Sequence, residues 1–214
     1  NADLMSDKNL AITAKNNIIT KEGANLSTKA DGTLKARTVG FGGDVHADGT
    51  LTIETDEQLA AKNITAGGDA VLTPGTDITV NDVTVGGDLN AKAKNITVTS
   101  VTGKGNAVLI ADKDVTVTGA FSAHNAELTA GENMTLGGKT DVGGTLTTNV
   151  AHDLTVNDAV TTGADFAAIV GNNAVTNGIV TTSGALKWNV GNDLTANAAV
   201  LSHGTTTIDA QNVN

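Results

Sequence analysis

The side chains that could do chemistry in this chain are four histidines and a regularly spaced series of acids and amides. A histidine can act as a base or bind a metal, and a row of carboxylates can hold calcium. The acids and amides open eight successive units and alternate strictly: Asp77, Asn95, Asp114, Asn133, Asp153, Asn173, Asp193 and Asn212. We expect these eight residues, the acid–amide row, to lie above one another along a repeating structure.

The alternation has a physical explanation that involves no catalysis. Carboxylates stacked at about 4.8 Å, the spacing of neighbouring strands, would repel one another by about 1–3 kcal/mol. An amide between them moves the charges to about 9.6 Å, near the screening length of about 8 Å at physiological salt, and can donate a hydrogen bond to the acid. We therefore predict a structural, hydrogen-bonded row at a corner. The alternative is coincidence between two residues that both suit turns.

The other polar candidates do not assemble into a catalytic or metal site. His124 and His203 fall at the same corner four turns apart, about 19 Å, so they cannot share a metal. We expect these two, with His46 and His152, to be solvated at the surface. The Gly-Gly-Asp triplets at 42–44, 67–69 and 86–88 lack the nine-residue period of calcium-binding repeats and are interpreted as turns. The sequence thus predicts no enzyme, no cofactor and no metal.

Two further patterns have simple structural explanations. Asn63, Asn95 and Asn133 each precede an x-Thr pair, but the repeat creates this glycosylation pattern by joining a corner Asn to a strand Thr. Thr-Val-Thr at 97–99 and 116–118 is typical of an ice-binding face, yet equivalent places elsewhere hold Asn or Gly. An outward threonine row that suits β-strands explains the threonines better.

Composition excludes several partners. Thirteen Lys and Arg stand against 23 Asp and Glu, a net charge of −10, and Arg37 is the only arginine. Such a chain is unsuited to nucleic acid, whose phosphates need cations. The absence of cysteine excludes disulfides, and no apolar run approaches the ~18 residues of a membrane span, so we expect no membrane insertion. The start at Asn1 has no signal-peptide pattern, and we expect a segment of something longer.

The elements that position these residues follow from the repeat itself. From Asp77 the units begin 18 to 20 residues apart, and each opens with apolar residues alternating with threonine, as a half-buried strand requires. Turn residues, a short apolar piece, a glycine corner and a second alternating stretch follow in each unit. Three short strands and three corners describe one turn of a triangular parallel β-solenoid. A single turn cannot bury its apolar face alone, so the turns must stack.

The first third of the chain follows the same pattern less regularly. Asn63 to Asp69 repeats as Asp82 to Asp88, but residues 1–76 otherwise appear as irregular turns, and 77–214 as regular ones, of one continuous solenoid. Thr55 and Gln58 resemble a helix capping box, so residues 54–62 are either a short helical excursion or an irregular coil. About ten or eleven turns predict a rod roughly 50 Å long.

The repeated pieces Asp-Leu-Thr-Val, Gly-Gly-Asp-Leu-Asn-Ala and His-Ala-Asp-Gly-Thr-Leu-Thr-Ile, in a cysteine-free acidic chain, resemble the haemagglutinin repeats of two-partner-secreted exoproteins. This family includes filamentous haemagglutinin, related bacterial adhesins and the large effectors of contact-dependent growth inhibition. The resemblance covers nearly the whole chain, most clearly from Thr50, and implies a right-handed parallel β-helix. Neither the family's N-terminal secretion domain pattern nor a C-terminal toxin domain is found here.

The resemblance implies a structural and adhesive segment of a filament, secreted or held on a Gram-negative cell surface. Its implied partners are an outer-membrane two-partner-secretion transporter and an unidentified receptor or glycan on a host or neighbouring cell. Two alternatives stay open at this point. The segment could be the delivery stick of a contact-dependent growth inhibition toxin, or a β-helix that binds or cleaves polysaccharide.

Overall fold

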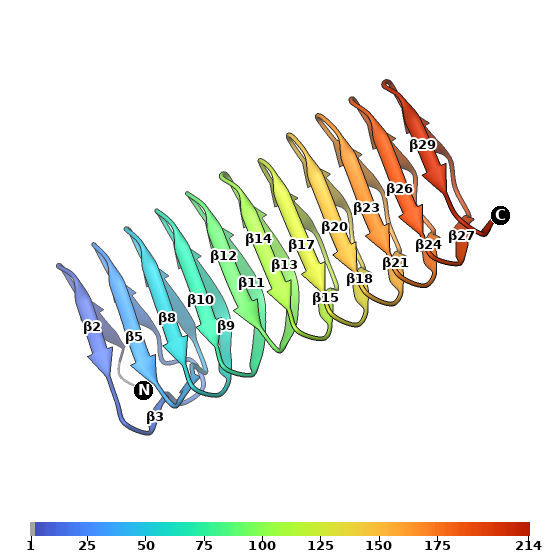
Figure 1. Ribbon diagram of the computed structural model, residues 1–214. Coiled ribbons are helices and arrows are strands. Elements are labelled where there is room, and N and C mark those ends of the chain that lie inside the picture. Colours follow the sequence, from blue (N-terminus) through green and yellow to red (C-terminus); the bar gives the residue numbers. More distant parts are fainter. Residues whose placement is uncertain (1–2) are drawn as a thin grey trace.

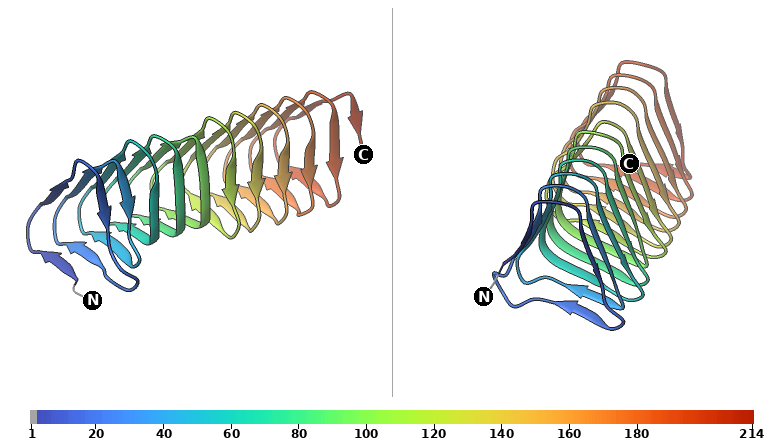
Figure 2. Two further views of the ribbon diagram at one scale, coloured as in Figure 1. Left: turned by 90° about the horizontal axis from the view of Figure 1, so that it is seen from below. Right: turned by 90° about the vertical axis from the view of Figure 1, so that its left-hand side faces the viewer.

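The protein is an all-β parallel solenoid. The computed structural model describes residues 3–214, and every regular element within that range is a strand. Successive turns stack along one axis into a rod, with the N-terminal turns at one end and the C-terminal turns at the other (Figure 1). Seen from the N-terminal end, the turns superpose into a three-sided outline (Figure 2). The solenoid predicted from the repeat is confirmed.

One side of the rod, face B, is a sheet of 11 parallel strands, one from each turn. In order along the rod they are β2 (Leu10–Thr13), β5 (Gly32–Ala36), β8 (Leu51–Thr55), β10 (Ala70–Pro74), β12 (Leu89–Ala93), β14 (Ala107–Ala111), β17 (Ala126–Ala130), β20 (Leu146–Val150), β23 (Phe166–Val170), β26 (Leu186–Val190) and β29 (Thr206–Asp209). The solenoid therefore has about eleven turns.

The other two sides, faces A1 and A2, belong to one 19-stranded sheet. Face A1 contains β3 (Asn17–Ile19), β6 (Thr38–Gly40), β15 (Val115–Val117), β18 (Met134–Leu136), β21 (Leu154–Val156), β24 (Ala174–Thr176), β27 (Asp193–Ala196) and β30 (Asn212–Val213). Face A2 contains β1 (Leu4–Ser6), β4 (Leu26–Thr28), β7 (Asp44–Ala47), β16 (Phe121–Ala123), β19 (Thr140–Val142), β22 (Val160–Thr162), β25 (Val180–Thr182) and β28 (Val200–Ser202). Three long strands run across both faces: β9 (Leu59–Ala66), β11 (Asp77–Val85) and β13 (Asn95–Gly103).

The long strands show how corner length controls strand number. In β11 only two residues separate the inward Val80 from the inward Val83, and the strand continues around the corner. In the turn containing β15 and β16, three residues separate Val117 from Phe121, and the strand breaks. Three short strands per turn are thus found in the C-terminal turns, while in three central turns two of them merge.

The register places like residues on like residues. Ile78 pairs with Ile96, and Ile96 pairs with Val115, so the inward aliphatic side chains stack in rows about 4.8 Å apart. The outward threonines stack in the same way: Thr79, Thr97, Thr116, Thr135 and Thr155. Because a slip by one residue would exchange the inward and outward sets, the alternation in the sequence fixes this register.

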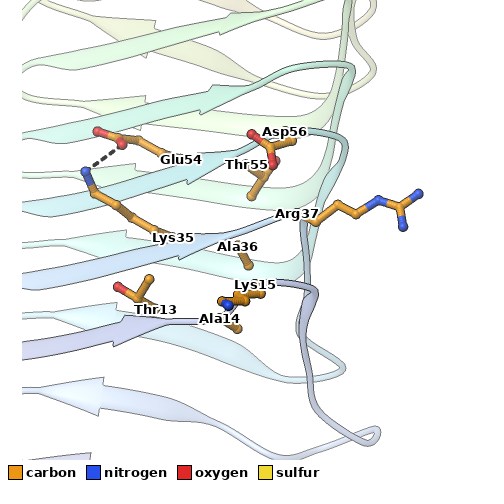
Figure 3. A pocket seen from close by; sticks show the side chains of 9 residues that line it. All are labelled: Thr13, Ala14, Lys15, Lys35, Ala36, Arg37, Glu54, Thr55 and Asp56. Atoms are coloured by element: carbon orange, nitrogen blue, oxygen red, sulfur yellow. Dashed lines mark ion pairs between the residues drawn. The ribbon is translucent and has the colours of Figure 1, made fainter.

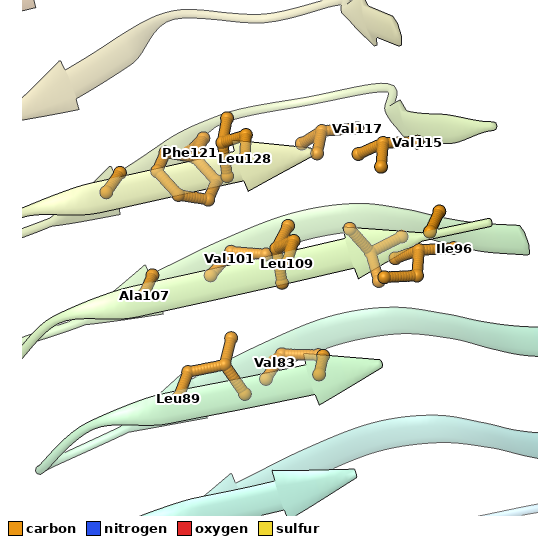
Figure 4. Close-up of a cluster of buried hydrophobic side chains, with 14 of the residues drawn as sticks. Val83, Leu89, Ile96, Val101, Ala107, Leu109, Val115, Val117, Phe121 and Leu128 are labelled. Atoms are coloured by element: carbon orange, nitrogen blue, oxygen red, sulfur yellow. The ribbon is translucent and has the colours of Figure 1, made fainter. Parts of the chain in front are cut away.

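The core is one continuous apolar column inside the rod. Figure 4 shows successive layers of it, formed by Val83 and Leu89, then Val101, Ala107 and Leu109, then Phe121 and Leu128. All of these side chains are buried. Stacked aliphatic rows fill the interior, and this explains why a chain with only 2% aromatic residues has a closed core.

Residues 54–62 are neither a helix nor an irregular coil, so both sequence interpretations were wrong. β8 ends at Thr55 and β9 begins at Leu59, with a tight corner between them. The Thr55 hydroxyl donates to the Glu57 carbonyl oxygen at 3.1 Å rather than capping a helix. Leu59 pairs with Val39 on one side and Ile78 on the other, and burial in that row outweighs the local helical tendency.

The N-terminal turns are also more regular than their sequence indicates. Leu10 pairs with Gly32, 22 positions later, but from there each face B strand pairs with one exactly a turn of 19 residues further on, through Leu51, Ala70 and Leu89. The longer first turn contains Gly23, whose positive φ of 75° marks a tight bend. The irregularity expected over residues 1–76 is therefore concentrated in the first turn.

Candidate functional site

The acid–amide row lies where the chain enters face A1. Asp77 pairs directly with Asn95, and Asp193 with Asn212. In four neighbouring pairs the asparagine Nδ2 donates to the aspartate Oδ1 of the preceding turn: Asn95 to Asp77 at 2.7 Å, Asn133 to Asp114 at 3.2 Å, Asn173 to Asp153 at 3.1 Å and Asn212 to Asp193 at 2.6 Å. The row is a series of amide-to-acid hydrogen bonds at a solvent-accessible corner.

Contacts also run from one such pair to the next. The backbone N–H of Asp153 donates to Asn133 Oδ1, and that of Asp193 donates to Asn173 Oδ1, both at 3.4 Å. Every member of the row is at least partly exposed, so each hydrogen bond is expected to contribute about 0.5–1.5 kcal/mol. The stabilising role of the row stays a prediction.

A second acid–amide row, which the sequence analysis missed, lies where the N-terminal turns enter face A2. Its members are Asp3, Asn25, Asp44, Asn63 and Asp82, continued by Ser100. Asn63 Nδ2 donates to Asp44 Oδ1 at 2.8 Å, and the Ser100 hydroxyl donates to Asp82. The signal was present in the 19-residue offset between Asn63 and Asp82. Aligning that offset with the earlier units would have revealed the whole row.

A third set of polar side chains forms an amide ladder at the corner between faces A1 and A2 in the C-terminal turns. Asn177 Nδ2 donates to Asn157 Oδ1 at 3.0 Å, and Asn197 Nδ2 donates to Asn177 Oδ1 at 2.8 Å. All three side chains are exposed. The three sets share one principle, since each polar side chain at a corner finds its partner in the neighbouring turn.

The histidines are dispersed. His46 Nε2 lies 2.7 Å from Asp48 Oδ1, and His203 Nδ1 lies 3.2 Å from the Thr182 carbonyl oxygen. A series of backbone hydrogen bonds, one per turn, links His124 to Gly204, the residue after His203. His124 and His203 therefore lie at the same corner, four turns apart. Among residues 3–214, no three His, Asp or Glu side chains come together as a metal site would require. The Gly-Gly-Asp triplets lie at corners, the first before face A2 and the other two before face B.

The outer surface near the N-terminal end of face B has a hollow that the sequence analysis did not identify. It measures about 320 Å³ and is lined by Thr13, Ala14, Lys15, Lys35, Ala36, Arg37, Glu54, Thr55 and Asp56 (Figure 3). The Lys35 Nζ atom lies 2.8 Å from Glu54 Oε2. The side chain of Arg37 points away from the hollow in Figure 3 and pairs with Glu57 at 2.7 Å.

The charges around this hollow largely balance. Glu57 accepts hydrogen bonds from the Arg37 guanidinium and the Thr38 hydroxyl, and these hold the pKa of its carboxyl below the usual 4.5. Lys15 and Asp56 add one charge of each sign to the rim. The hollow thus presents paired ions and hydroxyls to solvent, an arrangement suited to contacting polar or charged ligands. Its sequence signal was the spacing of 19 between Lys35-Ala-Arg37 and Glu54-Thr-Asp56.

Comparisons with known protein families, curated proteins and solved structures give no match. Within residues 3–214 there is no helix of the length and apolarity that a membrane crossing needs.

Proposed function

We propose that this chain is a structural and adhesive shaft segment of a large exoprotein secreted to, or held on, a Gram-negative cell surface. The observation that supports this most strongly is the continuous in-register stack of about eleven turns, from β2 to β29, around one apolar column. Each turn adds about 4.8 Å of length, and the ladder of backbone hydrogen bonds resists bending. Such a rod holds a binding surface away from its anchor.

The outward positions of this rod can vary without cost to the core. Thr84 on β11 is exposed, whereas its neighbour Val83 is 1% exposed, although the two are adjacent in sequence. Receptor contacts placed on outward residues therefore leave the stack intact. Secretion by an outer-membrane partner and a receptor or glycan on another cell remain parts of the proposal, supported by the resemblance of the repeats.

Adhesion can be tested by anchoring the chain to the surface of a non-adherent bacterium. We expect cells that display the chain to bind host or bacterial cell layers more than cells displaying the anchor alone. Thr84→Asp should retain binding, and Val83→Asp should abolish it, because the second change places a carboxylate in the apolar column. Equal binding by the chain and the bare anchor would contradict an adhesive role.

The shaft role needs a separate measurement. Deleting residues 154–173 removes one full turn, since Leu154 pairs with Ala174, and leaves the remaining register unchanged. We expect this variant to fold and to give a rod shorter by about 4.8 Å in solution scattering. Loss of folding would show that the turns are not interchangeable.

Polysaccharide binding is a second candidate, and the hollow beside Lys15, Lys35 and Asp56 is the observation that favours it. Its hydroxyl and charged groups suit a charged glycan, on the face B side of the solenoid. Titration with uronic-acid oligosaccharides would test this candidate, with Lys15→Gln as the variant. Binding by the unmodified chain that Lys15→Gln weakens would support it, and no binding would remove it.

A further inference from the structure

The amide ladder contains a chemically labile pair. Asn177-Gly178 is the only Asn-Gly sequence in the chain, and it lies at the exposed corner between β24 and β25. In the same ladder, Asn157 is followed by Asp158 and Asn197 by Ala198. The three asparagines occupy equivalent corner positions in successive turns, and the residues that follow them differ. The ladder therefore allows Asn177 to be compared with Asn157 and Asn197 within the same molecule.

The backbone of this turn leaves no room for a side chain at position 178, although the equivalent positions of the neighbouring turns hold Asp158 and Ala198. A Cβ atom at position 178 would lie 2.1 Å from the carbonyl carbon of Asp158 in the preceding turn, a distance that no side chain can occupy. A glycine leaves its own backbone nitrogen without the steric shield of a side chain. The close stacking of turns has thus placed a backbone nitrogen that has no side-chain shield next to an exposed side-chain amide.

The hydrogen bonds at the corner leave that nitrogen available. The Asn177 backbone N–H donates to the Val156 carbonyl oxygen at 2.8 Å, which holds the residue in the ladder. Among residues 3–214, no oxygen accepts a hydrogen bond from the Gly178 N–H, whereas the glycine at position 138 donates to Gly119 at 3.1 Å. The Gly178 nitrogen can therefore be deprotonated and approach Asn177 without first breaking a backbone contact.

We propose that Asn177 is a site of spontaneous deamidation. The Gly178 nitrogen gives its proton to hydroxide and attacks Asn177 Cγ, so that a new C–N bond closes a five-membered succinimide ring. The bond between Cγ and Nδ2 breaks, and the nitrogen leaves as ammonia after taking up a proton from water. A second water then opens the ring at either carbonyl and leaves aspartate or isoaspartate at position 177. No atom is oxidised or reduced.

The product disturbs the ladder in a defined way. A carboxylate at position 177 still accepts from Asn197 Nδ2 but has no hydrogen to give to Asn157 Oδ1, so two acceptors face each other where a 3.0 Å hydrogen bond stood. Isoaspartate lengthens the backbone just before Val180, whose register with Val160 depends on corner length. The modification would weaken the rod at this turn.

The test is to incubate the full chain at mildly alkaline pH and 37 °C and to follow each asparagine by peptide mass spectrometry. We expect Asn177 to convert several-fold faster than Asn157 and Asn197, with an isoaspartate product and incorporation of labelled oxygen from heavy-oxygen water. Conversion of Asn177 no faster than that of its two ladder neighbours would overturn the proposal.

A substitution provides an independent measurement. Asn177→Gln keeps an amide but lengthens the side chain and disfavours closure of a five-membered ring, so the fast conversion and its ammonia release should disappear. Persistence of that fast ammonia release in Asn177→Gln would show that it comes from another residue and would contradict the assignment. The comparison among Asn157, Asn177 and Asn197 in the unchanged chain needs no variant and holds even if Asn177→Gln folds poorly.

Discussion

The turns before Asp77 and those after it share a fold but differ in how their interiors are filled. The earlier turns have the less regular sequence, yet Val39, Leu51, Ile53 and Leu59 are fully buried in them. Their buried threonines have partners, as Thr28 does in the Lys8 carbonyl oxygen at 2.6 Å. A regular sequence repeat is therefore not required for a well-packed core.

The later turns have the regular repeat and the more imperfect interior. The hydroxyls of Thr140, Thr148 and Thr176 and the Nε1 of Trp188 are buried with no hydrogen-bond partner among the described residues. A small apolar cavity between two turns is lined by Leu154, Val156, Phe166, Ala168, Ala174, Thr176, Trp188 and Val190. Strand pairing and corner contacts hold the register there even where the side chains fill the space poorly.

The A1 corner differs between the two regions as well. Thr38 and Gln58 stand where later turns place the members of the acid–amide row. In their place an ion pair from Arg37 to Glu57 and a hydrogen bond from Thr38 to Glu57 tie the neighbouring turns together. At this corner, neighbouring turns are thus linked by an ion pair in the earlier region and by amide-to-acid hydrogen bonds in the later region.

The largest expected effect comes from removing Phe166 in the later turns. Phe166→Ala deletes a buried ring that packs edge-to-face on Trp188 at 5.5 Å and enlarges the existing cavity, which should cost about 3–5 kcal/mol. Because each turn contacts only its neighbours, hydrogen exchange should show lost protection around β20 to β26 and retained protection in β5 to β10. Ile169→Ala, on the same strand but 57% exposed, is the control. Uniform loss of protection would contradict this picture.

Thr176→Val should stabilise the later turns. The change keeps the shape of the side chain and removes a buried hydroxyl without a partner, which should gain about 1–3 kcal/mol. The matched control is Thr182→Val, which deletes a hydroxyl that donates to the Ala164 carbonyl oxygen at 2.5 Å and should destabilise. Thermal unfolding of both variants measures the effect. Equal shifts in the two melting temperatures would mean that the Thr176 hydroxyl is satisfied in solution.

Asn133→Asp tests the acid–amide row. It places a carboxylate between Asp114 and Asp153 and removes the donor to Asp114 Oδ1, so stability should fall by about 1 kcal/mol at low salt and recover at high salt. Asn149→Asp is the control, because its register partners Thr129 and Ile169 are uncharged. Melting temperatures at two salt concentrations suffice. An unchanged melting temperature for Asn133→Asp at both would favour the chance alternation of two turn residues.

The smallest effect concerns Glu57 in the earlier turns. Its pKa in the folded protein lies below 4.5 because Arg37 and Thr38 donate to the carboxylate. The interaction therefore stabilises the fold above about pH 4.5, and this contribution is lost as the pH falls through the folded pKa. Carboxyl titration by NMR should show the Glu57 pKa rising toward 4.5 in Arg37→Gln but not in Lys35→Gln. An unmoved pKa in Arg37→Gln would mean that Thr38 alone holds it down.

Local patterns were sufficient to predict much of this molecule. Alternation of apolar residues with threonine gave the strands and their inward faces, and the 18 to 20 residue period gave the stack, because a solenoid turn has only its neighbours to pack against. The positions of the acid–amide row also followed from that period. For residues 54–62 the same reasoning failed. The helix-capping pattern of Thr55 and Gln58 is a local signal, whereas the burial of Leu59 between Val39 and Ile78 depends on contacts with the neighbouring turns.

The sequence by itself determined the period, the inward and outward sets and the corner residues, because each depends on spacing along the chain. Only the tertiary structure decided where two strands merge and which charged side chains meet around the hollow at Lys15 and Lys35. Those outcomes depend on differences of one residue in corner length. Such a difference moves a side chain by a whole position against the next turn, while it leaves the local pattern nearly unchanged.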